Sequence, residues 1–284
     1  MIKEKFKQGK PVFSIEVFPP KKTSDIATIY AALDEFKNLN PAFISVTYGA
    51  GGSNSKSTAE IASYIKNQCH IEALSHLTCA SLSSTQDLED YIQTLTDKGV
   101  HNILALRGDQ PKEMTSEQFN RRKYKYASDL VAAIKEKNNF FVAGGCYPEK
   151  HPEAATFSED LSNLARKVEQ GTELLISQLF YDNEKFYRFL EHARAIGIDV
   201  PITAGLMPIT SPSQVKNILF LSSASIPSCL QRMIEKYKDS KDDLEKYGLE
   251  YTKKQMDALI AHGVDGIHLY SMNKVHVART IFDS

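Results

Sequence analysis

The chain has 284 residues, of which 42% are hydrophobic and 24% are charged, and its 34 basic and 35 acidic side chains give a formal net charge of -1. This composition is typical of a soluble globular protein, and the balanced charge argues against nucleic acid as a partner. No apolar run approaches the roughly 18 residues that a membrane span needs, and no signal-peptide core follows the basic segment 1–10, so we expect no membrane association.

Short apolar runs predict eight β-strands that alternate with longer amphipathic stretches. Most strand starts lie about 30 residues apart, the length of one strand, one helix and two loops. The predicted strands are Val12–Phe18, Phe43–Tyr48, Ile71–Thr78, Asn102–Leu106, Phe140–Cys146, Leu174–Phe180, Pro201–Leu206 and Gly266–Tyr270.

The stretches between the strands have helical periodicity and recognisable ends. The predicted helices include Ser24–Leu39, Ser55–Asn67, Thr85–Lys98, Ala127–Lys137, Ser158–Gln170, Asn183–Ile196 and Ser211–Leu221. The predicted N-terminal capping residues are Ser24, Ser55, Thr85, Ser158 and Asn183. Glycines that suit a left-handed C-terminal cap are Gly99, Gly171 and Gly197.

Strands that are apolar on both faces are typical of a parallel sheet covered by helices. Eight such units predict an α/β fold, a (β/α)8 TIM-type barrel; an open doubly wound sheet is the alternative. The interval from Pro201 to Gly266 is about twice the repeat. We therefore expect extra helices between strands 7 and 8. Residues from Ile226 to about Lys246 are predicted to form one added helix with a charged, exposed end, and we prefer a helix to a ninth strand at Ile218–Leu221. No linker is visible, so residues 1–284 are predicted to form a single domain.

Polar residues stand at the C-terminal ends of the predicted strands, where the loops of a barrel meet, and they predict one shared pocket. Glu16 lies in an apolar strand, and it is either functional or a floor carboxylate paired with an arginine. His76 alone is more often a satisfied core histidine, Arg107 and Asp109 are equally well a structural ion pair, and the glycines of segment 49–53 are more typical of a flexible loop than of a phosphate site. Further polar strand ends are Thr47, Tyr48, Thr78, Tyr147, Glu149, Gln178, Tyr181, Asp182, His268, Tyr270, Asn273 and Lys274.

The four cysteines lie far apart and form no Cys-x-x-Cys pair, and no metalloprotease or serine-hydrolase motif is present. We therefore expect no metal site, no disulfide framework and a cytoplasmic location with reduced thiols.

A set of short motifs occurs in a fixed order along the chain. The motifs are Glu16-Val-Phe-Pro-Pro-Lys, Ser45-Val-Thr-Tyr-Gly-Ala, His76-Leu-Thr-Cys, Leu106-Arg-Gly-Asp, Tyr126-Ala-Ser-Asp-Leu, Tyr147-Pro-Glu-Lys-His-Pro-Glu-Ala and Gln178-Leu-Phe-Tyr-Asp. From about Phe13 to Ala278 the chain resembles the bacterial 5,10-methylenetetrahydrofolate reductase family. The resemblance implies a catalytic, FAD-binding barrel that uses NADH or NADPH to reduce 5,10-methylenetetrahydrofolate to 5-methyltetrahydrofolate, which supplies methyl groups for methionine synthesis. It also implies a homo-oligomer whose partners are small molecules.

The same resemblance assigns roles to individual residues. Glu16 matches the catalytic acid, and Asp109 would stabilise a cationic intermediate. Implied contacts to FAD or nicotinamide are Thr47, Tyr48, Ala50, His76, Arg107, Gly108, Asp109, Tyr126, Ala127, Tyr147, His151, Asp160, Asn163, Arg166 and Lys167. Implied substrate contacts are Glu16, Asp109, Gln178, Gln214 and Lys274. Independently, Asp160, Asn163 and Lys167 have the spacing of one helix face, for which a solvated charged face is the alternative.

The chain departs from the family pattern at several positions. Lys274 stands where many bacterial relatives have an arginine, and it cannot bind a carboxylate in the bidentate way. Ile218 replaces a phenylalanine that stacks on substrate in some relatives. Strand 5 ends in Gly144-Gly145-Cys146 rather than in alanines, and segment 110–125 carries five basic residues, which favours a longer, mobile loop over the flavin.

Two other functions remain open from the sequence. A related FAD barrel could oxidise an amine such as proline, although a paired-arginine carboxylate clamp after strand 8 is missing. A non-catalytic barrel that binds folate or a protein partner is the other alternative.

Overall fold

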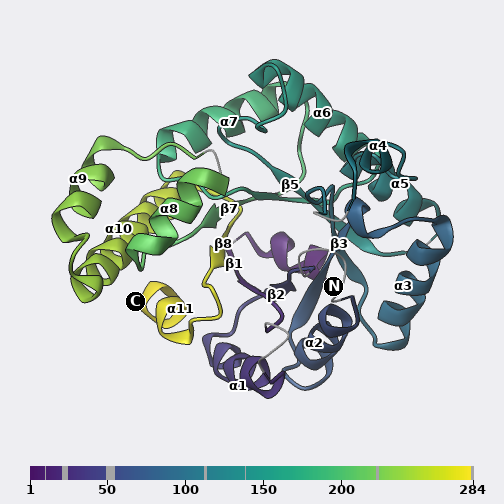
Figure 1. Ribbon diagram of the computed structural model, residues 1–284, viewed down its shortest axis with the longest axis horizontal. Helices are drawn as coiled ribbons and strands as arrows, with labels where there is room; N and C mark the ends of the chain where they lie inside the picture. Colours follow the sequence, from purple (N-terminus) through teal and green to yellow (C-terminus); the bar gives the residue numbers. More distant parts are fainter. Residues whose placement is uncertain are drawn as a thin grey trace.

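The computed structural model describes residues 1–9, 11–20, 25–48, 55–111, 114–137, 139–221 and 224–282. Eight parallel strands follow one another in sequence order and close into a barrel through pairing of the first strand with the last (Figure 1). The strands are β1 (Val12–Val17), β2 (Phe43–Val46), β3 (Glu72–Thr78), β4 (Asn102–Leu106), β5 (Phe141–Cys146), β6 (Leu174–Ser177), β7 (Ile202–Leu206) and β8 (Gly266–Tyr270). The predicted (β/α)8 barrel is confirmed, and the open sheet is wrong.

Helices surround the barrel in the ring seen in Figure 1. They are α1 (Ala27–Phe36), α2 (Ser55–Asn67), α3 (Thr85–Asp97), α4 (Ser116–Asn120), α5 (Ala127–Lys137), α6 (Phe157–Glu169), α7 (Asn183–Ala195), α8 (Pro212–Leu221), α9 (Ser228–Tyr237), α10 (Lys241–His262) and α11 (Val275–Phe282), with short 3-10 helices η1 (Ile2–Gln8), η2 (Lys37–Leu39) and η3 (Cys79–Ser81). None of the helices in the described ranges has the length and apolar character of a membrane span.

The extra helices predicted between strands 7 and 8 are present as α8, α9 and α10. Ile218–Leu221 belongs to α8 and is helical rather than a ninth strand. The added length is two helices and not one, because Ser240 interrupts the run and its hydroxyl caps α10 by accepting the Asp243 amide.

Several predicted helix caps are wrong by one or two residues, because the side chain of a preceding residue in extended conformation accepts the hydrogen bond from the helix amide instead. The side chains that accept from helix amides are Ser84 in α3, Thr156 in α6 and Asp182 in α7. The predicted caps Ser55, Thr85, Ser158 and Asn183 are helical residues instead, and Ser24 lies outside the described residues. The predicted C-terminal glycines are confirmed by positive φ angles at Gly99, Gly171 and Gly197.

The barrel interior is closed at the N-terminal ends of the strands. Ile2 and Phe6 of η1, the purple segment inside the ring in Figure 1, pack against interior side chains that include Val12, Phe43 and Phe141. A larger core fills the layer between the strands and the outer helices. The space left inside the barrel therefore lies at the C-terminal ends of the strands.

Candidate active site

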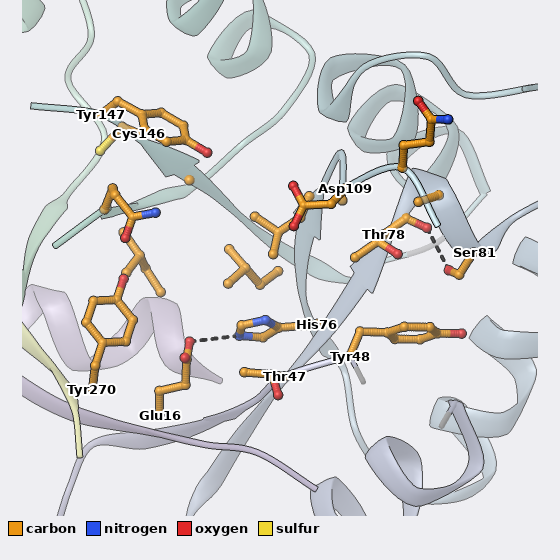
Figure 2. A pocket seen from close by; sticks show the side chains of 18 of the residues that line it. Glu16, Thr47, Tyr48, His76, Thr78, Ser81, Asp109, Cys146, Tyr147 and Tyr270 are labelled. Atoms are coloured by element: carbon orange, nitrogen blue, oxygen red, sulfur yellow. Dashed lines mark hydrogen bonds and ion pairs between the residues drawn. The ribbon is translucent and has the colours of Figure 1, made fainter. Parts of the chain in front are cut away.

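A cavity of about 650 Å³ occupies the C-terminal end of the barrel (Figure 2). Its lining draws on most strands of the barrel or on the loops that follow them. The sequence-predicted site residues among the lining are Glu16, Thr47, Tyr48, His76, Gly108, Asp109, Tyr147 and Gln178. Many of the predicted polar strand ends therefore line one pocket, whereas Glu149, Tyr181, Asp182, His268 and Asn273 do not line it.

Glu16 faces the barrel interior because Ile15 and Val17 on either side of it are buried in the outer core. Its carboxylate Oε2 lies 3.5 Å from Nε2 of His76 and 3.8 Å from Nε2 of His268. Within 4 Å of this carboxylate, the described residues place these two imidazole rings and no arginine, so the arginine-paired floor carboxylate considered from the sequence is wrong.

His76 is a buried histidine with an incomplete hydrogen-bond set. Burial lowers the pKa of its ring to about 4, although the nearby Glu16 opposes this shift. The ring is therefore neutral near pH 7, and its Nε2 has no hydrogen-bond partner among the described residues. Such a nitrogen beside a cavity is available to a ligand. The satisfied-core interpretation of His76 is therefore incomplete.

His268 lies fully buried beneath Glu16 and is held by two serines. Its Nδ1 lies 2.8 Å from the Ser14 hydroxyl, and its Nε2 lies 3.3 Å from the Ser45 hydroxyl. The polar layer under the cavity thus fixes the imidazole ring next to Glu16.

The loop after β4 carries Arg107, Gly108 and Asp109. Gly108 has φ +74°, and a Cβ built there would lie 2.8 Å from Thr78 Cβ, so the loop requires glycine. Asp109 is exposed at the cavity rim, across the cavity from Glu16 in Figure 2. Arg107 pairs with both carboxylate oxygens of Glu153 at 2.5 and 2.6 Å, so its ion-pair partner is not Asp109.

Helix α6 contributes two residues that hold the end of β5 and the loop after it. Lys167 is half-buried, desolvation lowers its pKa, and its ammonium donates to the Gly145 carbonyl. Asp160 accepts a hydrogen bond from the His151 amide at 2.9 Å. Asn163 and Arg166 of the same helix are exposed. These four residues therefore lie on α6 as predicted, and two of them, Asp160 and Lys167, already form hydrogen bonds with backbone groups of the protein.

The other predicted cofactor residues lie near the same loops. The rings of Tyr147 and His151 meet edge to face at 4.6 Å. Tyr126 is 62% exposed, and Ala127 is the first residue of α5. Ala50 lies outside the described residues.

A second cavity of about 480 Å³ shares Gln178 with the first. Ile218, Gln214 and Lys274 line it. Lys274 donates to the Thr210 hydroxyl at 2.8 Å. The Gln214 amide bonds within its own loop, accepting from the Thr210 amide at 2.8 Å and donating to the Pro208 carbonyl at 2.9 Å, so it shapes the cavity wall.

Several lining residues received no role from the sequence, although Thr78 and Tyr270 were among the polar strand ends predicted to share the pocket. The residues without a role are Thr78, Ala80, Ser81, Leu104, Leu106, Gln110, Pro111, Gly145, Cys146, Ile176 and Tyr270 in the first cavity, and Leu179, Met207, Thr210, Ser211, Ser213 and Met272 in the second. Apolar members carry no sequence signal that separates them from the core. Tyr270 had a signal, because it is a polar group at the end of a strand.

Comparisons with known proteins agree with these observations. The family model for methylenetetrahydrofolate reductase matches residues 1–284. The chain is 32% identical to the 5,10-methylenetetrahydrofolate reductase of Escherichia coli (strain K12), over 96% of this chain and 90% of that protein. It is also 32% identical to methylenetetrahydrofolate reductase (NADH) 1 of Arabidopsis thaliana, over 96% of this chain and 48% of that protein, so it spans about half the length of this plant relative.

A solved structure of a Clostridium thermocellum protein, described as binding two copies of 5-methyl-5,6,7,8-tetrahydrofolic acid, superimposes with a TM-score of 0.68 at 17% identity. The superposition covers 99% of this chain and 96% of that chain. At this identity the likeness shows a shared fold.

Proposed function

Because the chain belongs to the methylenetetrahydrofolate reductase family, we propose that it reduces 5,10-methylenetetrahydrofolate to 5-methyltetrahydrofolate, with bound FAD and a nicotinamide nucleotide as reductant. The observation that carries the proposal is a pair of carboxylates, Glu16 and Asp109, on opposite sides of one large cavity at the catalytic end of a barrel. The names of the plant relatives support NADH as the first reductant to test.

The cavity suits a flat heteroaromatic group such as the flavin ring. Leu104, Leu106 and Ile176 supply an apolar wall, Gly108 borders the cavity without a side chain, and His76 has a free ring nitrogen. When bound, FAD would take a hydride from the nicotinamide and give it to the folate.

Two groups of residues would hold the cofactor. We assign Thr47, Tyr48, Ala50, His76, Gly108, Asp109 and Tyr147 to the ring and the nicotinamide. We assign Arg107, Tyr126, Ala127, His151, Asp160, Asn163, Arg166 and Lys167 to the nucleotide portion. The cations Arg107, Arg166 and Lys167 would face the diphosphate, where charge-assisted hydrogen bonds are strongest.

Glu16 has the position that the folate chemistry needs. The methylene carbon of the substrate is bonded to two nitrogens, and it becomes a good hydride acceptor only when one carbon–nitrogen bond breaks to leave an iminium cation. A proton delivered to the leaving nitrogen drives this ring opening, and we assign its delivery to Glu16. Asp109 lies across the cavity, and we assign to it the stabilisation of the positive charge that results.

The remaining substrate contacts fall around the second cavity. Gln178 borders both cavities, and a primary amide can donate to and accept from the edge of a pterin ring. Lys274 supplies a positive charge for a carboxylate of the substrate tail, and Gln214 forms the wall beside it. In this arrangement the two ends of one folate would lie in two cavities that share Gln178.

The proposal includes a cytoplasmic homo-oligomer, as expected from the sequence. The unpaired thiols of Cys69, Cys79 and Cys146 support a reducing compartment.

An absorbance experiment tests the function directly. The purified protein should show a flavin spectrum, should bleach anaerobically with NADH or NADPH, and should regain colour when 5,10-methylenetetrahydrofolate is added, with 5-methyltetrahydrofolate as product. A colourless protein that still binds folate would favour the non-catalytic barrel. Reoxidation that fails with the folate, together with flavin reduction by proline, would favour the amine dehydrogenase.

A further inference from the structure

The β6–β7 ladder ends before the last residues of the two strands. Its last paired residues are Ile176 and Thr203. If the same register continued, the Gly205 amide would donate to the Ser177 carbonyl. Instead that amide donates to the Ser177 hydroxyl at 2.8 Å. The sheet is therefore loosened at the residue that precedes Gln178.

The hydroxyl of Tyr270 takes the place of the missing donor. It donates to the Ser177 carbonyl at 2.7 Å, from β8, which lies beyond β7. The Tyr270 ring can reach across β7 only because residue 205 is glycine. A Cβ at Gly205 would lie 2.2 Å from the Ser177 oxygen and 2.8 Å from Tyr270 Cε2. The hydrogen bond from Tyr270 to the Ser177 carbonyl therefore requires glycine at position 205.

Tyr270 also stands where the active-site groups meet. It is the register partner of Glu16 on the neighbouring strand, and Figure 2 shows the two side chains next to each other. Burial and the nearby Glu16 raise the pKa of Tyr270 well above its usual value, so its hydroxyl keeps the proton it donates.

The Ser177 hydroxyl also restrains the backbone of Gln178. It donates to the Gln178 carbonyl at 2.9 Å, and the backbone N–H of Gln178 donates to the Cys146 carbonyl at 2.7 Å. The backbone of Gln178, which borders both cavities, is thus held from both sides.

We propose that Tyr270 is a positioning residue for the folate. Through the Ser177 carbonyl it fixes the backbone of Gln178, so that the side-chain amide of Gln178 lies between the first cavity, which would hold the pterin, and the second, which would hold the tail of the substrate. This inference rests on the proposed function. Its consequence is that the Tyr270 hydroxyl acts on the folate half of the reaction and only through Gln178.

The test compares Tyr270→Phe with wild-type holoenzyme in separate half-reactions. We expect the KM for 5,10-methylenetetrahydrofolate to rise by about 10-fold, the effect of one hydrogen bond whose loss leaves a buried carbonyl unpaired. Flavin content and the rate of flavin reduction by NADH should stay within about twofold. In a Gln178→Ala background, adding Tyr270→Phe should change the folate KM by less than about twofold, because the side-chain amide that Tyr270 positions is already absent.

Tyr251→Phe is the matched control. The Tyr251 hydroxyl also donates to a carbonyl of the segment after β6, that of Tyr181 at 2.6 Å, but Tyr251 lines neither cavity. It should leave the folate KM unchanged. An equal rise in this control, or a full effect of Tyr270→Phe in the Gln178→Ala background, would overturn the proposal.

Ser177→Ala keeps the test decisive if Tyr270→Phe does not fold. This change removes the bonds to Gly205 and to the Gln178 carbonyl and leaves the tyrosine ring in place. It should raise the folate KM in the same way, and a wild-type KM would contradict the inference. If the wild-type flavin is not reoxidised by the folate at all, the proposed function fails instead, and the two failures are distinguishable.

Discussion

The carboxylate of Glu16 lies 3.5 Å from Nε2 of His76, whose ring is neutral at physiological pH because burial lowers its pKa to about 4. A neutral imidazole can share a hydrogen bond with a carboxyl group but cannot neutralise its charge. His76 therefore gives Glu16 a polar neighbour that is not a counter-ion. This pairing suits a group that must both carry and release a proton.

Replacement of Glu16 by Gln should separate the two half-reactions. The amide keeps the shape of the side chain but has no transferable proton. Flavin reduction by NADH should continue at a near-normal rate, while reoxidation by 5,10-methylenetetrahydrofolate should slow by about 10²–10⁴-fold. Stopped-flow absorbance of the flavin measures each step.

Glu173→Gln is the control for a purely structural carboxylate. Glu173 is similarly part-buried, but it lies beside the N-terminal end of β6 and pairs with Lys3 and Lys135. It should lower stability without separating the half-reactions. If Glu16→Gln slows both half-reactions equally, Glu16 is structural as well.

The depressed pKa of His76 predicts a pH dependence of folding stability. The unfolded chain binds a proton at this histidine near pH 6.5 and the folded chain only near pH 4, so protonation favours unfolding in between. This contribution is complete above pH 6.5 and is lost as the pH falls towards 4. Between pH 8 and 5 the free energy of unfolding should fall by on the order of 2 kcal/mol from this group. Urea unfolding of wild type and His76→Asn at both pH values measures the difference, and an equal fall in the variant would assign the effect to other groups.

Two neighbouring cations of α6 should behave differently when removed. Arg166→Ala should weaken FAD retention with little change in Tm, because this side chain is exposed and free to meet a phosphate. Lys167→Ala should weaken retention and also lower Tm, because it breaks the bond to the Gly145 carbonyl. Flavin stoichiometry after dialysis and thermal unfolding of the apoprotein report the two effects. Normal FAD retention in the double variant would remove α6 from the cofactor site.

Gly144 should tolerate no larger side chain. Its absent Cβ would lie 3.2 Å from Lys167 Cε and 3.3 Å from Thr172 Cγ2, so Gly144→Val should force the lysine aside and cost about 1–3 kcal/mol of stability. Gly145→Ala is the control, because its Cβ would make only an ordinary contact at 3.5 Å with Leu106. Denaturant unfolding separates the two, and equal losses would show that any side chain in this strand is harmful.

The strand-and-helix pattern could be predicted from sequence because it depends on local periodicity. Most C-terminal strand ends follow from the same pattern, and those of β3, β4, β5, β7 and β8 are as predicted. The end of β6 is not: it stops at Ser177, three residues before the predicted Phe180, and the next residue, Gln178, borders the cavities. Contacts made by barrel closure were also out of reach. Glu16 meets Tyr270 only through the register of the first strand against the last, which no local pattern specifies. Likewise, the local sequence around Arg107 does not indicate that its ion-pair partner is Glu153.

The plug formed by Ile2 and Phe6 has a consequence for how ligands exchange. In the described part of the chain the N-terminal end of the barrel is closed, so a molecule reaches the cavity from the end where the strands finish. A nicotinamide and a folate that must each contact the same bound ring would then need the same entrance and the same volume. We therefore expect each substrate, at high concentration, to act as a competitive inhibitor of the other.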